Sequence, residues 1–131
     1  MATHTTDFWP DDIGEIGEPE MRTPVALLRE QAIALGEKTK NVVTAAVESD
    51  TDGSMFVHTL YLAAPSINYK YQLLTVRHPL LLYPLLAKEP NNIAWEKLES
   101  EDDFVQWLKT ILASENTKKV IRALKAQSQG S

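Results

Sequence analysis

The chain has no cysteine among its 131 residues. This absence excludes disulfides, thiolate nucleophiles and cysteine-based zinc or iron–sulfur sites, and it fits a reducing compartment. Histidine is scarce too. The chain has three, and no two stand three or four residues apart, the spacing that presents two ring nitrogens to one metal ion on a helix. We expect no metal and no cofactor, and we take the cytoplasm as the expected location.

Basic charge and long apolar runs are also lacking. With 18 acidic and 13 basic residues the net charge is −5, which disfavours nucleic acid and anionic membranes as partners. The longest strongly apolar stretch, residues 79–87, is interrupted by Pro84 and is shorter than the roughly 20 residues that span a bilayer. No secretory signal is recognised, because residues 1–20 hold six acids and neither Lys nor Arg. We therefore expect neither a nucleic-acid partner nor a membrane partner.

The common catalytic and ligand-binding motifs are missing as well. No G-x-S-x-G pattern supplies a serine nucleophile, and no third glycine follows Gly14 and Gly17 to build a nucleotide loop. Residues 48–53 begin like a calcium-binding loop, but the twelfth position, which should bring a bidentate carboxylate, is Thr59. Basic residues near the C-terminus follow from the helix dipole and do not indicate a DNA-reading helix. These absences favour a binding or regulatory protein over an enzyme.

What is present predicts one small α+β domain. A chain of this length hides roughly two thirds of its unfolded surface, which is enough for one core. Its 44% hydrophobic and 24% charged residues are ordinary for a globular protein. We predict a flexible acidic arm over residues 1–21, a single domain over residues 22–127 and a frayed tail over residues 128–131.

Capping residues predict where the helices begin. Thr23 followed by Pro24 starts the first helix, because a threonine hydroxyl caps free N–H groups and proline fits the first turn. Apolar residues at helical spacing continue this helix to about residue 40. Ser100 with Asp103 resembles a capping box, and Ser114 restarts the helical pattern. The last part of the chain is therefore predicted to form two helices.

Strand-forming residues fill the middle of the chain. The predicted segments are, in order, residues 42–47, 55–63, 69–77, 79–87 and 93–98. The first two are joined by a hairpin loop over residues 48–54, and the fourth is interrupted by Pro84. We therefore predict an α+β fold with an N-terminal helix, an antiparallel meander of three to five strands, and two C-terminal helices packed on the sheet.

Three tyrosines on the predicted strands are candidates for a binding surface. Tyr61, Tyr69 and Tyr71 have amphipathic rings of the kind common in interfaces and ligand pockets. Strand alternation places Tyr69 and Tyr71 on one face of the sheet. If the helices cover that face, these rings belong to the core. Otherwise they line a partner site with Lys70 or Arg77 at its edge.

Two histidines on the strands invite different interpretations. His78 ends a strand beside Arg77, where binding residues often project from a scaffold, although a structural turn is the alternative. His58 alternates with Phe56 and Leu60, which is more typical of a core or rim residue than of a catalytic base. His78 is therefore kept as a candidate binding residue.

Large aromatic residues interrupt the acidic arm at Phe8 and Trp9. Such rings gain free energy only where they find a surface to cover. The arm is accordingly either an idle tail or a docking peptide for a partner or for the domain itself.

Three segments resemble those of small uncharacterised bacterial proteins. They are YLAAP at residues 61–65, NYKY at residues 68–71 and SENTKKVI at residues 114–121. The resemblance extends over most of the chain after Thr23. It implies a bacterial cytoplasmic domain and carries no activity to transfer.

Three functions stay open at this stage. The leading hypothesis is a non-enzymatic protein-interaction or regulatory module, of the immunity or antitoxin type, with a protein as its partner. An alternative is a small-ligand-binding protein or an unrecognised enzyme with a pocket near Tyr69, Tyr71, Arg77 and His78. A structural subunit that buries its sheet in a homodimer is the third.

Overall fold

The computed structural model describes residues 6–17 and 22–130. The remaining positions of the predicted arm and tail, residues 1–5, 18–21 and 131, lie outside the described residues. The predicted flexibility of the arm and fraying of the tail therefore stay predictions.

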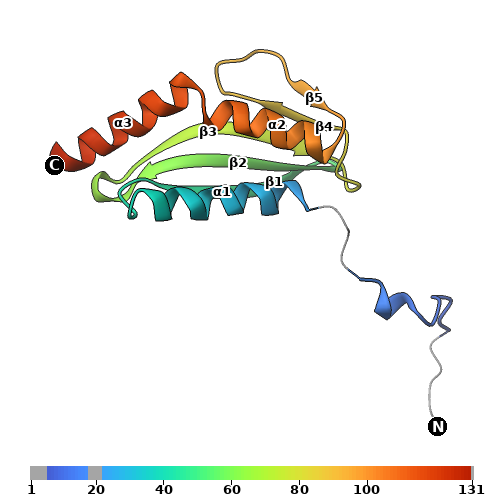
Figure 1. Cartoon of the computed structure of the whole chain (residues 1–131). Helices are drawn as coiled ribbons and strands as arrows, with labels where there is room; N and C mark the ends of the chain where they lie inside the picture. Colours follow the sequence, from blue (N-terminus) through green and yellow to red (C-terminus); the bar gives the residue numbers. More distant parts are fainter. Residues whose placement is uncertain (1–5, 18–21, 131) are drawn as a thin grey trace, which may run out of the picture.

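A helix, five strands and two further helices follow one another along the chain (Figure 1). They are α1 (Pro24–Lys38), β1 (Thr44–Asp52), β2 (Met55–Ala64), β3 (Tyr69–His78), β4 (Leu85–Lys88), β5 (Glu96–Leu98), α2 (Glu101–Leu112) and α3 (Glu115–Gly130). Single 3-10 turns, η1 (Ile13–Glu15) and η2 (Pro65–Ile67), lie in the arm and between β2 and β3. The strands pair antiparallel in the order β1-β2-β3-β4-β5. The predicted α+β fold is confirmed.

The three helices lie on one face of the sheet, which we call the covered face. One core cluster joins buried residues of β2 and β4, such as Leu60 and Leu85, to Leu28 of α1, Phe104 of α2 and Leu124 of α3. On the other side, the open face, residues such as Thr59 and Tyr61 of β2 stay partly exposed. No helix among residues 22–130 is long and apolar enough to cross a bilayer.

The helix starts follow the predicted caps. The side chain of Thr23 accepts a hydrogen bond from the Ala26 N–H at 3.2 Å, with Pro24 in the first turn. Ser100 accepts from the Asp103 N–H at 3.2 Å, and three acids in the first turn of α2 suit the positive end of its dipole. These bonds are local, so the sequence predicts them well.

The predicted hairpin loop over residues 48–54 is wrong. Strand β1 continues to Asp52, and only Gly53 and Ser54 connect it to Met55. Gly53 adopts a φ of 61°, a left-handed conformation that costs glycine little. The acids that suggested a turn are alternate residues of a strand whose carboxylates stand on the open face, where water solvates them.

The strands after β3 are shorter than predicted. Pro84 ends a turn instead of interrupting a strand, and β4 begins directly after it at Leu85. Leu80 and Leu81, which looked like strand residues, lie in that turn and are 73% and 81% exposed. Ile93 is likewise exposed and outside β5. Apolar character alone misplaced these residues because it does not distinguish a strand from an apolar turn.

Candidate functional site

An apolar groove runs over the covered face between α1 on one side and α2 with α3 on the other. Its first part has a cavity volume of about 270 Å3 and its second part about 280 Å3. Gln31 and Leu112 line both parts, so the two hollows lie next to each other between the helices, and we call them together the helix groove. The groove is also lined by Arg22, Leu27, Ala34, Lys38, Lys109 and Ile121.

The helix groove follows from the residue pattern of α1. Leu27, Gln31, Ala34 and Lys38 recur at spacings of three or four residues and therefore stand on one side of the helix. The short side chain of Ala34 does not fill the space toward Leu112 across the channel. The groove is therefore a part of the covered face that the helices leave incompletely filled.

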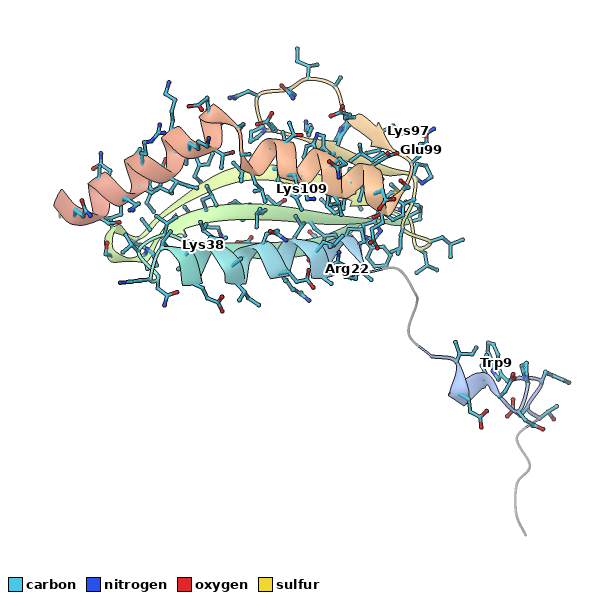
Figure 2. All side chains as sticks on the ribbon, viewed as in Figure 1. Trp9, Arg22, Lys38, Lys97, Glu99 and Lys109 are labelled. Carbon is cyan, nitrogen blue, oxygen red and sulfur yellow. The ribbon has the colours of Figure 1, made fainter. Side chains whose placement is uncertain are left out.

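Three cations surround the helix groove. Arg22 and Lys38 mark the two ends of α1, and Lys109 faces them from α2 (Figure 2). Arg22 forms an ion pair with Glu30 at 2.9 Å, and its backbone N–H donates to Glu101. Within residues 22–130, Lys38 and Lys109 form no ion pair. An apolar channel with a basic rim suits a ligand that combines apolar side chains with acids.

Tyr69 and Tyr71 line a second hollow, of about 470 Å3, between the start of β3 and α3. Val120, Leu124 and Ile67 complete its apolar wall. As predicted, the two tyrosines share a face, because they pair with Ala64 and Leu62, both buried on the covered face. We call this site the tyrosine hollow.

The other predicted site residues lie elsewhere. Tyr61 stands on the open face with the Lys70 ammonium 4.2 Å from its ring centroid. Arg77 is also on the open face, where it pairs with Asp52 at 3.0 Å. His78 is 5% exposed and points to the covered face at the far end of β3. The predicted pocket of Tyr69, Tyr71, Arg77 and His78 is therefore not assembled.

A bulge explains the separation. Leu60 pairs with Leu74 whereas Tyr61 pairs with Gln72, so Leu73 is an extra residue in β3. One inserted residue reverses strand alternation beyond it. Tyr71 and Arg77 are both odd-numbered, yet they point to opposite faces. Nothing in the sequence marks this position as a bulge.

His78 instead forms a buried pair with His58. Their Nε2 atoms are 3.0 Å apart, His78 Nδ1 is 2.8 Å from the Pro79 carbonyl, and His58 Nδ1 is 2.7 Å from the Ser49 hydroxyl. A carbonyl only accepts, so His78 Nδ1 carries a proton and its Nε2 accepts from His58. The Ser49 hydroxyl then donates to His58 Nδ1. One set of neutral tautomers satisfies all three hydrogen bonds.

This Ser–His–His chain resembles a catalytic triad in order but not in electrostatics. Burial, with the positive potentials of His78 and Arg29, lowers the pKa of His58 to about 4. A triad base needs a partner that stabilises its imidazolium, normally a carboxylate. Here the partner is a second imidazole, which brings no negative charge. The arrangement therefore favours packing, as the sequence predicted for His58, over activation of Ser49.

The aromatic residues of the arm are exposed. Phe8 is 90% exposed and Trp9 71% exposed, so neither covers the domain surface in this structure (Figure 2). Among residues 6–17 and 22–130, no three His, Asp or Glu side chains come together as a metal site.

Comparison with protein-family models, curated proteins and solved structures finds no match to this chain. No activity, ligand or partner is therefore transferred from a relative.

Proposed function

We propose that the protein is a non-enzymatic protein-interaction module of the bacterial cytoplasm whose helix groove takes up an apolar segment of a partner protein. The observation that carries this proposal is the open apolar channel between α1 and α2–α3, with Arg22, Lys38 and Lys109 at its rim. Grooves of this kind receive the apolar face of an amphipathic helix. An immunity or antitoxin protein that masks its target is one form of such a module.

The chemistry of the groove defines the partner segment. Two or three apolar anchors each contribute about 1.5–3 kcal/mol when fully buried, which has to offset the entropic cost of association. Acidic residues beside the anchors would face Lys38 and Lys109, and complementary charge raises association rates more than affinity. The partner segment is therefore expected to be amphipathic and acidic.

Site-specific photo-crosslinking tests this function. A photoreactive amino acid replaces Gln31 in the groove or, as the matched control, Thr59 on the open face. In cells that express the protein, we expect a discrete protein adduct from position 31 and none from position 59. Ala34→Trp, which fills the channel, should abolish the adduct. Adducts from both positions, or from position 59 alone, would contradict a groove-binding function.

A second candidate function is the binding of a small ligand in the tyrosine hollow. Its volume of about 470 Å3 exceeds that of either part of the helix groove, and two phenol rings stand on its wall. Small-ligand sites are mostly apolar with a few polar groups, as this one is. Ligand-observed NMR with a library of small aromatic compounds should give hits that Tyr71→Ala removes and Ala34→Trp does not. Hits insensitive to Tyr71→Ala would exclude the hollow.

A further inference from the structure

The arm carries the same chemistry that the helix groove would recognise. Phe8, Trp9, Ile13 and Ile16 are all exposed, at 90%, 71%, 43% and 70%. Four acids, Asp7, Asp11, Asp12 and Glu15, stand among them, and residues 6–17 contain no Lys or Arg. The exposed apolar side chains of the arm are complementary to the apolar groove, and its acids are complementary in charge to the basic rim.

The arm is already partly folded into turns. The Ile13 N–H donates to the Pro10 carbonyl at 3.1 Å, the Glu15 N–H to Asp12 at 2.9 Å and the Ile16 N–H to Ile13 at 3.4 Å. If these turns continue as a helix, Trp9, Ile13 and Ile16 stand at positions i, i+4 and i+7, along one side. This is the spacing of the anchors with which amphipathic helices enter grooves.

The point of attachment favours the groove over other surfaces. Arg22, the first described residue after the arm, itself lines the mouth of the groove. From Trp9 to Arg22 the extended chain reaches roughly 40 Å, whereas α1 is about 22 Å long. The arm can therefore place Trp9 anywhere along the channel. A tether of this length gives an effective concentration near millimolar, so even weak contacts would hold the arm in place for much of the time.

We propose that residues 7–16 of this chain fold back into its own helix groove, with Trp9 and Ile13 as anchors and the acids facing Lys38 and Lys109. The exposed arm of Figure 1 is then the open form. This inference rests on the proposed function, because a docked arm competes with the partner segment. With the arm docked in half of the molecules or more, the apparent partner affinity falls about two-fold or more.

Paramagnetic relaxation in the full chain tests the docking. Because the chain has no cysteine, a single Gly14→Cys substitution accepts one nitroxide label, and a Cβ atom at position 14 meets no atom within 4 Å. We expect the amide signals of Gln31, Lys109 and Leu112 to broaden several-fold more than those of Thr59 and Thr75 on the open face. The double variant Trp9→Ser/Ile13→Ser, with the same label, should lose this difference. Equal broadening of both sets, or no effect of the double variant, would overturn the proposal.

Mixing experiments separate this inference from its alternatives. A chain that carries the nitroxide label but no 15N is mixed with a 15N chain that carries no nitroxide. Groove broadening in the mixture as strong as within one chain would mean that the arm enters a second copy, and it would overturn docking within the chain. Thermal unfolding of the double variant should remain cooperative and should fall below that of the parent only by the stabilisation that the docked arm adds.

A competition measurement distinguishes failure of this inference from failure of the proposed function. The probe is 1-anilinonaphthalene-8-sulfonate, an apolar anion suited to the channel. The affinity of the protein for the probe should rise about two-fold or more in the Trp9→Ser/Ile13→Ser variant. In a protein that already carries Ala34→Trp, adding the same two substitutions should leave the affinity for the probe unchanged. Crosslinks from position 31 together with an unchanged probe affinity would refute the docking of the arm and would leave the proposed interaction function standing. Docking of the arm without any crosslink to a partner protein would refute the proposed interaction function. The arm would then be a structural element of this chain.

Discussion

The two faces of the sheet are built from alternate residues of the same strands, yet they differ in burial, in packing and in exposed charge. On the covered face, Leu60 and Leu62 are 1% and 2% exposed and pack under three helices. On the open face, ion pairs such as Arg77–Asp52 lie in contact with water. Burial energy is concentrated on the first face, whereas exposed ion pairs each contribute about 0–1 kcal/mol. The covered face holds the fold together, and the spaces left in it are the candidate sites.

Neighbouring residues of β2 give the largest expected contrast. Leu60→Ala removes a fully buried side chain and should lower the free energy of unfolding by about 2–5 kcal/mol. Thr59→Ala, one residue away on the open face, should lower it by less than about 1 kcal/mol. Urea unfolding monitored by circular dichroism measures both. Similar losses at the two positions would mean that the open face is also packed, for example against a second copy.

The buried histidine pair makes the covered face sensitive to acid. The folded-state pKa of His58 is about 4, against 6.5 in the unfolded chain, so the unfolded state binds the extra proton between these values. Stability from this pair is therefore complete above pH 6.5 and declines as the pH falls toward 4, by up to roughly 3 kcal/mol. His58→Gln keeps a donor toward His78 and should flatten this part of the profile. Equal slopes for both proteins would show that other groups cause the acid sensitivity.

Filling the helix groove should separate binding from stability. Ala34→Trp adds apolar area to a channel that is already open, so the free energy of unfolding should change by less than about 1.5 kcal/mol. The same substitution should remove the crosslink from position 31. A loss of several kcal/mol in urea unfolding would indicate that the channel is closed in solution and that it is no site.

The open face should tolerate the loss of an ion pair. Asp52→Asn removes the charge that Arg77 faces, and because Asp52 is 68% exposed the expected loss is below about 1 kcal/mol. The loss should shrink further in 0.5 M salt, since screening weakens exposed pairs. A larger, salt-independent loss would place this pair in a dry interface and would favour the homodimer alternative.

The smallest expected effect is on the mass in solution. If water solvates the open face, sedimentation equilibrium should give a monomer, and Thr59→Arg should not alter it. A dimer that Thr59→Arg dissociates would establish the homodimer and would remove the contrast between the two faces.

Local features of this fold could be predicted, and features that depend on register could not. Thr23 and Ser100 start helices through hydrogen bonds to residues three positions away, which any chain with these residues can form. The acids of β1 were mistaken for a turn. They are alternate residues of the strand that face water, and this alternation can be recognised only when the pairing of β1 with β2 is known. For the candidate site, Tyr69 and Tyr71 were correctly placed on one face, but the bulge at Leu73 carried Arg77 to the other.

The amino-acid sequence by itself determined the chemistry excluded by the absence of cysteine, the order of helices and strands, and the caps that begin the helices. Only the tertiary structure decided which face of the sheet is covered, that His58 meets His78, and that a groove stays open between α1 and α2–α3. The physical reason is the separation along the chain between the residues that interact. Capping and periodicity act over three or four residues of one backbone, whereas the groove and the histidine pair depend on side chains that twist, register and a single extra residue bring together from distant parts of the chain.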